Sequence, residues 1–253
     1  MNEKFDVLGA SVDVIDKDSA VELIISEMRE NLCFKYVVTP NADHLINLSK
    51  DHYFKLSYDS SWMCVADGWP VLLAAKILGR SLPGRVTGSD LVPSILSRCS
   101  NDGFNISVCI IGGIGDVPKR AAENIEKEYP GVKVSGFFSP NFGFDESEEK
   151  TREVVDYINS CNSDLIIVGL GSPKQEKWVY KNKDKIHSGV AICAGATVDF
   201  IAGSVKRAPV WVSKMGMEWL YRLIQEPSRL YRRYARVFIY LPRMIVLEKI
   251  KGK

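Results

Sequence analysis

A glycine-rich turn at residues 169–178 (GLGSPKQEKW) has the composition of a phosphate-binding turn. It follows residues 164–168 (DLIIV), a short apolar run that predicts a buried parallel strand. The glycines allow the backbone to approach a ligand closely, and Pro173 suits the first position of a helix. Unpaired N–H groups at the start of such a helix favour phosphate, and Lys174 and Gln175 would add a charge and an amide. The alternative is an ordinary strand-to-helix turn.

Four further segments repeat the order of apolar strand, unusual turn and helix. The predicted strands are residues 35–38, 62–66, 106–111 and 190–193, and the turns after them are residues 39–41, 67–70, 112–115 and 194–197. This alternation predicts an α/β fold with a mostly parallel, Rossmann-like sheet and helices on both faces. Ligands bind beyond the carboxyl ends of strands in such sheets, so all five turns should converge on one crevice. Gly112 and Gly171 in these turns are therefore candidate substrate-binding positions.

Asp67 is the strongest candidate for a catalytic residue. It ends a predicted buried strand and precedes Gly68, so it should face the crevice. A carboxylate there can act as a general base with a pKa tuned by partial burial, whereas the alternative is an Asp that caps the next helix. Thr39 and Asn41 end the neighbouring strand and offer neutral hydrogen-bonding groups to a polyhydroxylated ligand. The alternative for this pair is turn formation, because Pro-Asn is a common turn sequence.

Patterns that could bind a metal ion or a dinucleotide are weak. Residues 16–18 (DKD) resemble the Asp-x-Asp of metal-dependent sugar transferases, but they directly precede a helical pattern and predict a helix cap. His44 and His52 lie on a helical stretch without a third imidazole nearby, so we predict no zinc site. Residues 112–115 lack the third glycine of the dinucleotide fingerprint. The sequence thus predicts neither a metal ion nor a cofactor.

Length and composition set the broad class. The chain has 253 residues, of which 46% are hydrophobic, enough for one large α/β domain with an appendage. We predict a catalytic domain at residues 1–202 and an appendage at residues 203–253. The polar N-terminus does not resemble a signal peptide. Cys64, Cys109 and Cys193 fall inside predicted strands, which favours reduced thiols and a cytosolic location.

The appendage is strongly basic, whereas the rest of the chain is acidic. Residues 203–253 carry twelve Lys or Arg against three Glu, a net charge of +9, and the remaining residues carry −7. Apolar stripes at residues 219–224 and 231–238 make this segment amphipathic, which is typical of helices that lie on anionic membranes. The apolar run at residues 237–247 is too short to span a bilayer, which needs about 20 residues. The alternative is a helix packed on the body with its basic residues in solvent.

Motifs along nearly the whole chain resemble those of the WecG/TagA/CpsF glycosyltransferases (glycosyltransferase family 26). The matching segments are 39–41 (TPN), 66–68 (ADG), 85–91 (RVTGSDL), 169–176 (GLGSPKQE), 206–209 (KRAP), 218–223 (EWLYRL) and 226–229 (EPSR). The resemblance runs in order from the first strand to about Arg233. The PKQE and EWLYR blocks together make it highly specific.

The resemblance implies a metal-independent, inverting transfer of a sugar from a UDP donor to a polyprenyl-diphosphate-linked saccharide. Such enzymes build bacterial surface polysaccharides at the inner face of the cytoplasmic membrane. By motif, Asp67 would deprotonate the acceptor hydroxyl, and Thr39 and Asn41 would line the sugar site. The absence of a metal cluster in the sequence would leave helix N-termini, Lys174 or arginines of the appendage to stabilise the departing UDP.

The same resemblance implies substrate contacts for polar side chains in both parts of the chain. Arg85 and Gln175 would contact donor or acceptor, and Asp199 the nucleoside. The lipid diphosphate would be bound by three arginines of the appendage, Arg222, Arg229 and Arg232. Their spacings of seven and three residues should place them near one helical face, and arginine bonds phosphate oxygens in pairs. Residues 38–45 (VTPNADHL) look nearer to the exopolysaccharide branch of the family, in which the donor can be UDP-glucose.

Two other classes of protein stay open at this point. A nucleotide-dependent oxidoreductase would need a complete glycine fingerprint and a ribose-binding acid. A non-catalytic nucleotide-binding membrane adaptor would use the basic appendage alone. Nucleic acid is not an expected partner, because the body of the chain is acidic. The sequence is compatible with a homo-oligomer, and it leaves the transferred sugar open between a hexose such as glucose and an N-acetylhexosamine such as N-acetylmannosamine.

Overall fold

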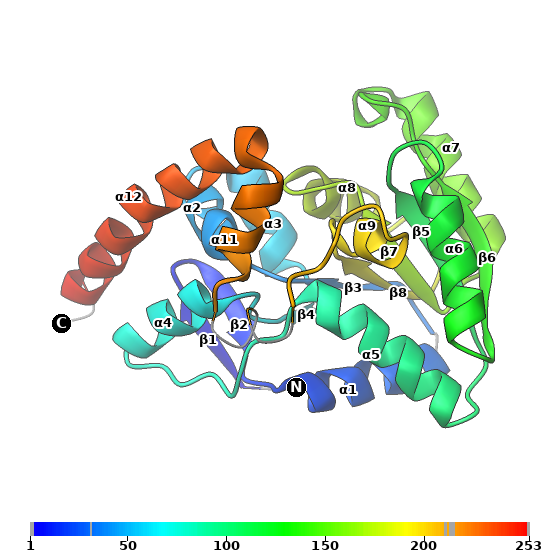
Figure 1. Cartoon of the computed structure of the whole chain (residues 1–253), viewed down its shortest axis with the longest axis horizontal. Helices are drawn as coiled ribbons and strands as arrows, with labels where there is room; N and C mark the ends of the chain where they lie inside the picture. Colours follow the sequence, from blue (N-terminus) through cyan, green and yellow to red (C-terminus); the bar gives the residue numbers. More distant parts are fainter. Residues whose placement is uncertain (1–2, 31, 210–211, 213–215, 252–253) are drawn as a thin grey trace.

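The computed structural model describes residues 3–30, 32–209, 212 and 216–251. Its centre is a six-stranded parallel sheet with the order β4-β3-β8-β7-β5-β6 (Figure 1). The strands are β3 (Lys35–Val38), β4 (Met63–Cys64), β5 (Ile106–Gly112), β6 (Val132–Phe138), β7 (Leu165–Gly169) and β8 (Val190–Cys193). Two short strands, β1 (Lys4–Val7) and β2 (Ala10–Asp13), form a separate antiparallel pair. The predicted α/β fold with a parallel sheet is confirmed.

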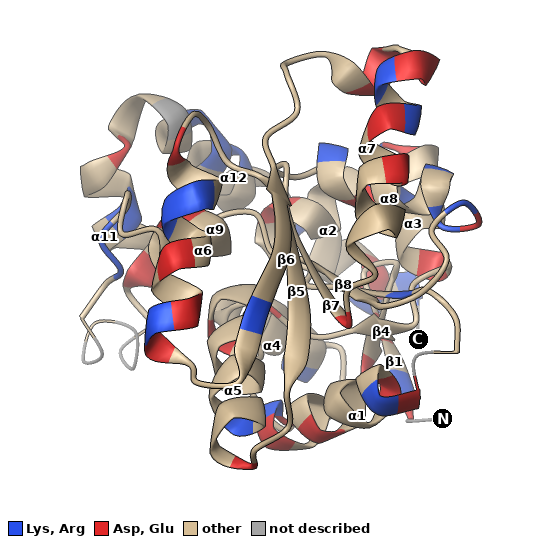
Figure 2. Cartoon of the chain, turned by 90° about the vertical axis from the view of Figure 1, so that its right-hand side faces the viewer, with Lys and Arg blue, Asp and Glu red and all other residues tan. Residues whose placement is uncertain are grey.

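Helices cover both faces of the sheet, as predicted (Figure 2). One face carries α2 (Ala42–Leu48), α3 (His52–Asp59), α4 (Trp69–Ile77), α7 (Glu148–Cys161) and α8 (Lys174–Asn182). The other carries α1 (Lys17–Glu30), α5 (Gly88–Asn101), α6 (Val117–Glu128) and α9 (Thr197–Ile201). Adjacent residues of one strand, such as Ile166 and Ile167, belong to opposite cores. Because successive side chains point to opposite faces, a strand covered on both sides needs continuous apolar sequence.

The sequence patterns do not predict three of the strands, and a fourth strand is shorter than predicted. β6 lies at the edge of the sheet, where its side chains alternate between more and less exposed positions, so its apolar residues form no run. β1 and β2 are tied to the sheet through the Cys64 N–H, which donates to the Asp13 carboxylate at 2.8 Å. This long-range bond has no local sequence signal. β4 covers two residues of the predicted 62–66, and the flanking Trp62 and Val65 N–H groups also donate to carbonyls of β3.

The appendage contains α11 (Glu218–Gln225) and α12 (Pro227–Lys251). α12 packs along α2 and reaches α4 (Figure 1). Its Leu241 and Ile245 are buried within the core on that face of the sheet. The appendage is therefore packed against the body by apolar contacts. Within the described ranges, no helix is both long enough and apolar enough to cross a membrane.

Candidate active site

The carboxyl ends of the parallel strands bring the predicted turns together. Gly112 at the end of β5 pairs with Gly169 at the end of β7, and a side chain at Gly112 would collide with the Gly169 backbone. A Cβ added at Gly88, at the start of α5, would lie 2.9 Å from the Ala194 Cβ and 3.7 Å from the Thr39 Oγ1. The ends of β3 and β8 thus lie against the start of α5. The predicted turns therefore follow strands that end at one edge of the sheet, and a shared crevice there stays a prediction.

The turn between β7 and α8 uses much of its own polar surface. α8 begins at Lys174, so Pro173 stands just before the helix rather than at its first position as predicted. Gln175 accepts the Gly171 N–H at 3.2 Å, and it donates to the Glu176 carboxylate at 2.9 Å. One of the two amide hydrogens of Gln175 is thereby committed. The turn offers an anion the second hydrogen and the positive end of α8.

Lys174 is tied to the loop after β6. Its Nζ lies 2.9 Å from Asp145 Oδ1 and sits near two aromatic rings, 4.9 Å from the centroid of Phe142 and 5.9 Å from that of Phe144. A phosphate at this turn would therefore share Lys174 with Asp145.

Three candidates for the donor side lie at neighbouring strand ends. Gly112 ends β5, Gly171 follows β7, and Asp199 is a half-buried residue of α9, the helix that follows β8. These three strands are adjacent in the sheet. Their turns are placed for one extended ligand, and the individual contacts stay predictions.

Asp67 is half-buried beyond β4, and its backbone N–H donates to the Pro40 carbonyl at 2.9 Å. α4 begins without a side-chain cap, so Asp67 does not have the capping role that was its alternative. Burial raises the pKa of Asp67 to about 7; the charge of Glu218 adds to this increase, and Arg85 and Arg222 oppose it. A carboxylate that changes protonation near neutral pH at the ligand-binding end of a sheet has the properties of a general base.

Arg85 connects the loop before α5 to the appendage. Its Nη1 donates to Glu218 Oε2 at 3.2 Å, and its Nη2 lies 3.8 Å from Asp90 Oδ2. Asp90 also accepts from Thr87 Oγ1 at 2.9 Å and pairs with Arg207. Residues of the body and residues within and before α11 therefore share one network of charges next to Asp67.

Asn41 caps α2 and also contacts the appendage. Its side-chain oxygen accepts the backbone N–H groups of Asp43 at 3.0 Å and His44 at 3.2 Å. The same oxygen accepts Nη2 of Arg233 from α12 at 3.0 Å. These bonds show that Asn41 forms the turn at the start of α2, which was the alternative to a ligand-binding role. A contact with a sugar stays a prediction and would use the side-chain nitrogen.

The three arginines expected to share one helical face lie on two helices, so this prediction is wrong. Arg222 is on α11, whereas Arg229 and Arg232 are on α12, because α11 ends before Pro227. The Arg222 guanidinium lies 5.7 Å from the centroid of the Phe200 ring, and its buried Nε makes no hydrogen bond to any described residue. Arg232 is exposed, and the side chain of Arg229 lies outside the described residues.

Two other arginines of α12 face the body. Arg233 Nε lies 3.4 Å from Asp43 Oδ2, and Arg236 pairs with the same carboxylate. We call Asp43, Arg233 and Arg236 the α2–α12 clamp. The sequence does not distinguish these two arginines from the other basic residues of the segment. Which face of α12 meets the body is decided by the burial of Leu241 and Ile245 in the core.

Comparison with known proteins decides the class of this site. A model of the glycosyl transferase WecG/TagA/CpsF family matches residues 5–253. The chain belongs to this family. It is therefore a glycosyltransferase, which confirms the resemblance and decides against the oxidoreductase and adaptor alternatives.

Three relatives of this family member cover most of its length. The Staphylococcus aureus (strain MW2) protein is 29% identical over 244 residues, which is 94% of this chain and 91% of the relative. The Bacillus subtilis (strain 168) protein is 28% identical over 249 residues, 97% of this chain and 88% of the relative. The Bacillus spizizenii protein is 28% identical over 218 residues, 86% and 81% respectively. All three are named N-acetylglucosaminyldiphosphoundecaprenol N-acetyl-beta-D-mannosaminyltransferase.

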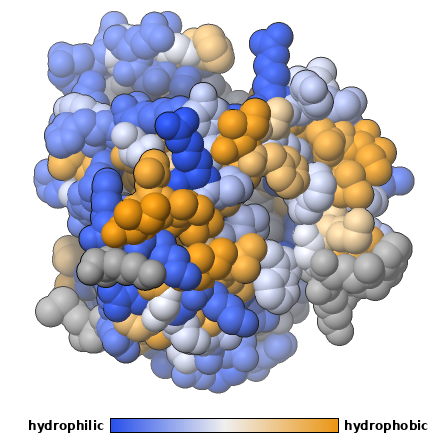
Figure 3. All heavy atoms as spheres, turned by 90° about the vertical axis from the view of Figure 1, so that its left-hand side faces the viewer, coloured by the Kyte–Doolittle hydropathy of each residue, from blue (hydrophilic) through white to orange (hydrophobic). Residues whose placement is uncertain are grey.

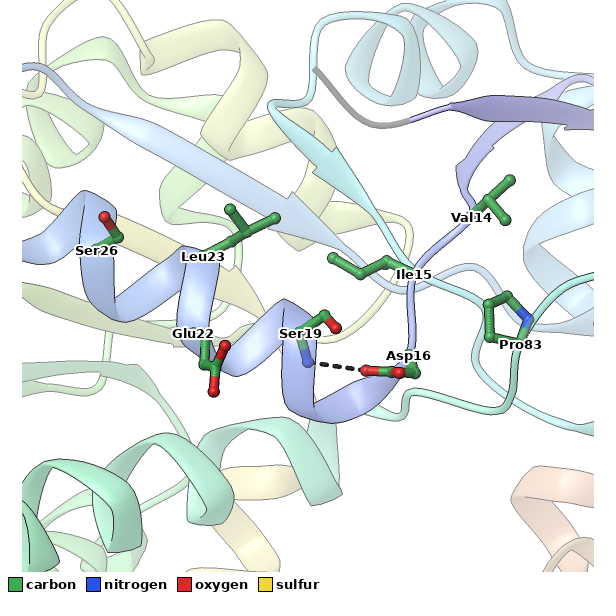
Figure 4. A pocket seen from close by; sticks show the side chains of 8 residues that line it. All are labelled: Val14, Ile15, Asp16, Ser19, Glu22, Leu23, Ser26 and Pro83. Atoms are coloured by element: carbon green, nitrogen blue, oxygen red, sulfur yellow. Dashed lines mark hydrogen bonds between the residues drawn. The ribbon is translucent and has the colours of Figure 1, made fainter.

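Asp16 caps α1 in this glycosyltransferase. Its carboxylate accepts the Ser19 N–H at 2.8 Å, and this bond lowers the pKa of Asp16 (Figure 4). Asp16 lines a pocket together with Val14, Ile15, Ser19, Glu22, Leu23, Ser26 and Pro83. The predicted cap at residues 16–18 is confirmed. In the part of the chain that the structure describes, no three His, Cys, Asp or Glu residues are grouped to hold a metal ion.

His44 is buried and contacts the side chain of Asn41, and the sequence did not indicate this contact. Burial lowers the pKa of His44 to about 3, and Arg233 adds to this decrease, so the ring is neutral. Its Nε2 lies 3.2 Å from Asn41 Nδ2, and its Nδ1 lies 2.7 Å from Tyr58 Oη. Because an amide nitrogen can only donate, Nε2 accepts and Nδ1 carries the proton. His44 thus orients Asn41, and its spacing of three residues from Asn41 is the only local signal of this contact.

Glu176 is a fully buried carboxyl that the sequence analysis did not single out. Its side chain has no exposed surface, and burial raises its pKa to about 7, opposed by the hydrogen bond from Gln175. Glu176 stands three residues before the buried Val179, which places both on the inward face of α8. That periodicity is the signal that could have found it.

Proposed function

We propose that this glycosyltransferase transfers a hexose or an N-acetylhexosamine from a UDP-sugar to a polyprenyl-diphosphate-linked saccharide, without a metal ion and with inversion. The observation that carries the proposal is Asp67, a half-buried carboxyl whose pKa is raised to about 7 by burial at the carboxyl edge of the sheet. The relatives are named as enzymes that transfer N-acetylmannosamine to N-acetylglucosaminyl-diphosphoundecaprenol. These names support the proposed class of donor and acceptor.

The reaction is a single displacement. Asp67 takes the proton of an acceptor hydroxyl while that oxygen attacks the anomeric carbon of the donor. The bond between this carbon and the UDP oxygen breaks, and its electron pair leaves with UDP. Thr39 and Asn41, at the end of the neighbouring strand, line the sugar. Above pH 7 Asp67 is ionised and accepts the proton, and below pH 7 it is protonated and cannot.

The donor side stabilises the charge that develops on UDP. The positive end of the α8 dipole lies at the turn after β7, where Gly171 is exposed and has open space in place of a side chain. Lys174 and the free amide hydrogen of Gln175 add donors there. Asp199 on α9 contacts the nucleoside.

The appendage binds the lipid diphosphate. Arg222 acts electrostatically on Asp67, and its buried Nε lacks a hydrogen-bond partner among the described residues. A buried cationic donor in this state is suited to a diphosphate oxygen. Arg229 and Arg232 on α12 extend this binding surface, and Arg85 contacts donor or acceptor from the loop before α5.

The outer faces of α4 and α12 form an apolar surface that suits a membrane. Figure 3 views the side of the molecule on which α12 and α4 lie, where apolar side chains gather among hydrophilic ones. The exposed apolar residues of these helices are Trp69, Leu73, Ile77, Tyr231, Phe238, Ile239, Tyr240, Val246, Leu247 and Ile250. With the net charge of +9 on residues 203–253, this surface is suited to the anionic inner face of the bacterial cytoplasmic membrane.

Mass spectrometry of reaction products tests the donor and the acceptor. The full chain is incubated with a panel of UDP-sugars, including UDP-glucose and UDP-N-acetylmannosamine, and with a short-chain polyprenyl-diphosphate saccharide. We expect the mass of one hexose or N-acetylhexosamine to be added, and proton NMR of the product to give the opposite anomeric configuration to the donor. Retained configuration, or no product with any member of the panel, contradicts the proposal.

The variant Asp67→Asn tests the base. Its turnover should fall by roughly 10²–10⁴-fold, while UDP affinity measured by calorimetry stays close to that of the wild type. Asp59→Asn is a matched control, since Asp59 is an exposed acid of α3 paired with Lys55. Near-normal turnover in Asp67→Asn would remove the general-base role.

A further inference from the structure

Glu218, the first residue of α11, reaches from the appendage to the catalytic end of the sheet. Its Oε2 accepts Nη1 of Arg85 at 3.2 Å, across 133 positions of sequence. Both side chains are largely covered, with 17% of Glu218 and 19% of Arg85 exposed. The ion pair therefore forms at the interface between the appendage and the loop before α5.

The charge of Glu218 acts on Asp67. After burial, Glu218 is the largest cause of the raised pKa of Asp67, and Asp90 acts in the same direction. Arg85 and Arg222 act in the opposite direction. The ionisable groups around Asp67 come from four parts of the fold: Glu218 and Arg222 on α11, Arg85 before α5, Asp90 on α5 and Tyr58 on α3.

We propose that Glu218 is a positioning residue for sugar transfer, which fixes Arg85 and brings a carboxylate next to Asp67 only when α11 is docked on the body. This inference rests on the proposed role of Asp67 as the general base. With α11 docked, Asp67 is buried beside a like charge and is a strong base. With α11 undocked, Asp67 would lose both Glu218 and Arg222, whose charges act on its pKa in opposite directions, and it would also lose burial, the largest cause of the raised pKa, so it would be a weaker base.

The test is the pH dependence of kcat/KM for Glu218→Gln in the full chain, because this quantity reports the pKa of the free enzyme. Removing the like charge and releasing Arg85 both favour ionised Asp67. The midpoint of the acid limb should therefore move down by roughly half a pH unit, and kcat/KM at pH 6, relative to its value at pH 8, should rise about threefold.

Two variants separate this effect from a structural one. Glu248→Gln removes the same charge from an exposed position on α12 and should leave the midpoint unchanged. Glu218→Asp keeps the charge and should restore much of the wild-type midpoint. A loss of rate in Glu218→Gln that is equal at all pH values, with an unchanged midpoint, overturns the proposal.

A carbon-13 NMR titration of Asp67 without substrate distinguishes failure of this inference from failure of the proposed function. If Glu218→Gln lowers the Asp67 midpoint, the contact between Glu218 and the base is supported even where the transfer assay gives no product. If the midpoint stays the same in an enzyme that transfers sugar and loses activity in Asp67→Asn, the proposed function holds and the role of Glu218 is wrong.

Discussion

Two helix starts in the body and two charged residues of the appendage bond partners at very different distances along the sequence. In the body, Asn41 and Asp16 accept N–H groups only two or three residues away along their own helices. In the appendage, Arg233 bonds a residue 192 positions away, and Glu218 bonds one 133 positions away. Short-range bonds form as soon as the helix forms, whereas the long-range bonds require docking. The two helix starts in the body therefore form locally, whereas the contacts of Arg233 and Glu218 form only when the appendage is docked.

Magnitudes indicate what keeps the appendage in place. Partly exposed ion pairs such as those of the α2–α12 clamp contribute about 0–1 kcal/mol each. Full burial of a Leu or Ile side chain contributes about 1.5–3 kcal/mol, and Leu241 and Ile245 are both buried. Apolar contacts thus supply most of the docking free energy. The ion pairs determine the position of α12 along α2.

Removal of residues 215–253 separates the two regions and should have the largest effect. We expect transfer to a lipid-diphosphate acceptor to be lost and binding to anionic liposomes to weaken, because both depend on the appendage. UDP binding should persist, since Gly112, Gly171 and Asp199 all precede the cut. Calorimetry and liposome flotation measure these outcomes, with circular dichroism to confirm that the body is folded. Full transfer, or unchanged flotation, would mean that the appendage only packs on the body.

The variant Asp43→Asn opens the α2–α12 clamp without removing the appendage. Loss of one carboxylate leaves Arg233 and Arg236 without their shared partner, so α12 should shift along α2. The KM for the lipid acceptor should rise roughly tenfold, equivalent to about 1.4 kcal/mol, with UDP affinity unchanged. Asp102→Asn, which breaks an ion pair with Arg98 at the C-terminal end of α5, is the matched control. An equal rise in both variants would contradict a specific role for the clamp.

Glu176→Gln should affect only the stability of the body. The pKa of Glu176 is about 7 in the folded chain because the carboxyl is buried, against 4.5 for a solvated Glu side chain. Between these pH values unfolding releases a proton, so the free energy of unfolding falls as pH rises, by about 1.4 kcal/mol per pH unit. The stability from this group is complete below pH 4.5 and lost by pH 7.

Urea unfolding at several pH values measures this slope. It should be smaller in Glu176→Gln than in the wild type, because the amide does not ionise, and Glu153→Gln, at an exposed position of α7, should keep the wild-type slope. A wild-type slope in Glu176→Gln would show that Glu176 does not titrate in this window.

Chelation should have the smallest effect. If helix N-termini and the arginines of the appendage together balance the charge of UDP, turnover in excess EDTA should equal turnover without it. The wild-type transfer assay with and without EDTA, followed by addition of Mg²⁺ or Mn²⁺, measures this. Loss in chelator with recovery on addition of metal would mean that cationic side chains are insufficient.

The sequence predicts the body better than the interface between the body and the appendage. The runs that form β5, β7 and β8 are apolar because both faces of those strands are covered, and such runs can be recognised locally. Asp67 follows from the same logic, because it lies just beyond such a strand. β6 does not, since an edge strand with one solvated face has no continuous apolar run.

The contacts of the appendage could not be predicted because they depend on docking. The arginine spacing suggested one helix, but the break at Pro227 divides Arg222 from the arginines of α12. Glu218 belongs to a family motif, residues 218–223. Its contact with Arg85 nevertheless forms only when α11 lies against the loop before α5. Helical periodicity gives the faces of a helix, and packing against another element decides which face is used.

The strand order has a consequence for synthesis of the chain. β8 is the last strand in the sequence, yet it lies between β3 and β7. Until residues 190–193 leave the ribosome, β4-β3 and β7-β5-β6 are two separate half-sheets, each with an open, apolar edge. Nascent chains that end before β8 should therefore be protease-sensitive and bind chaperones, with resistance gained in one late step when the central strand inserts.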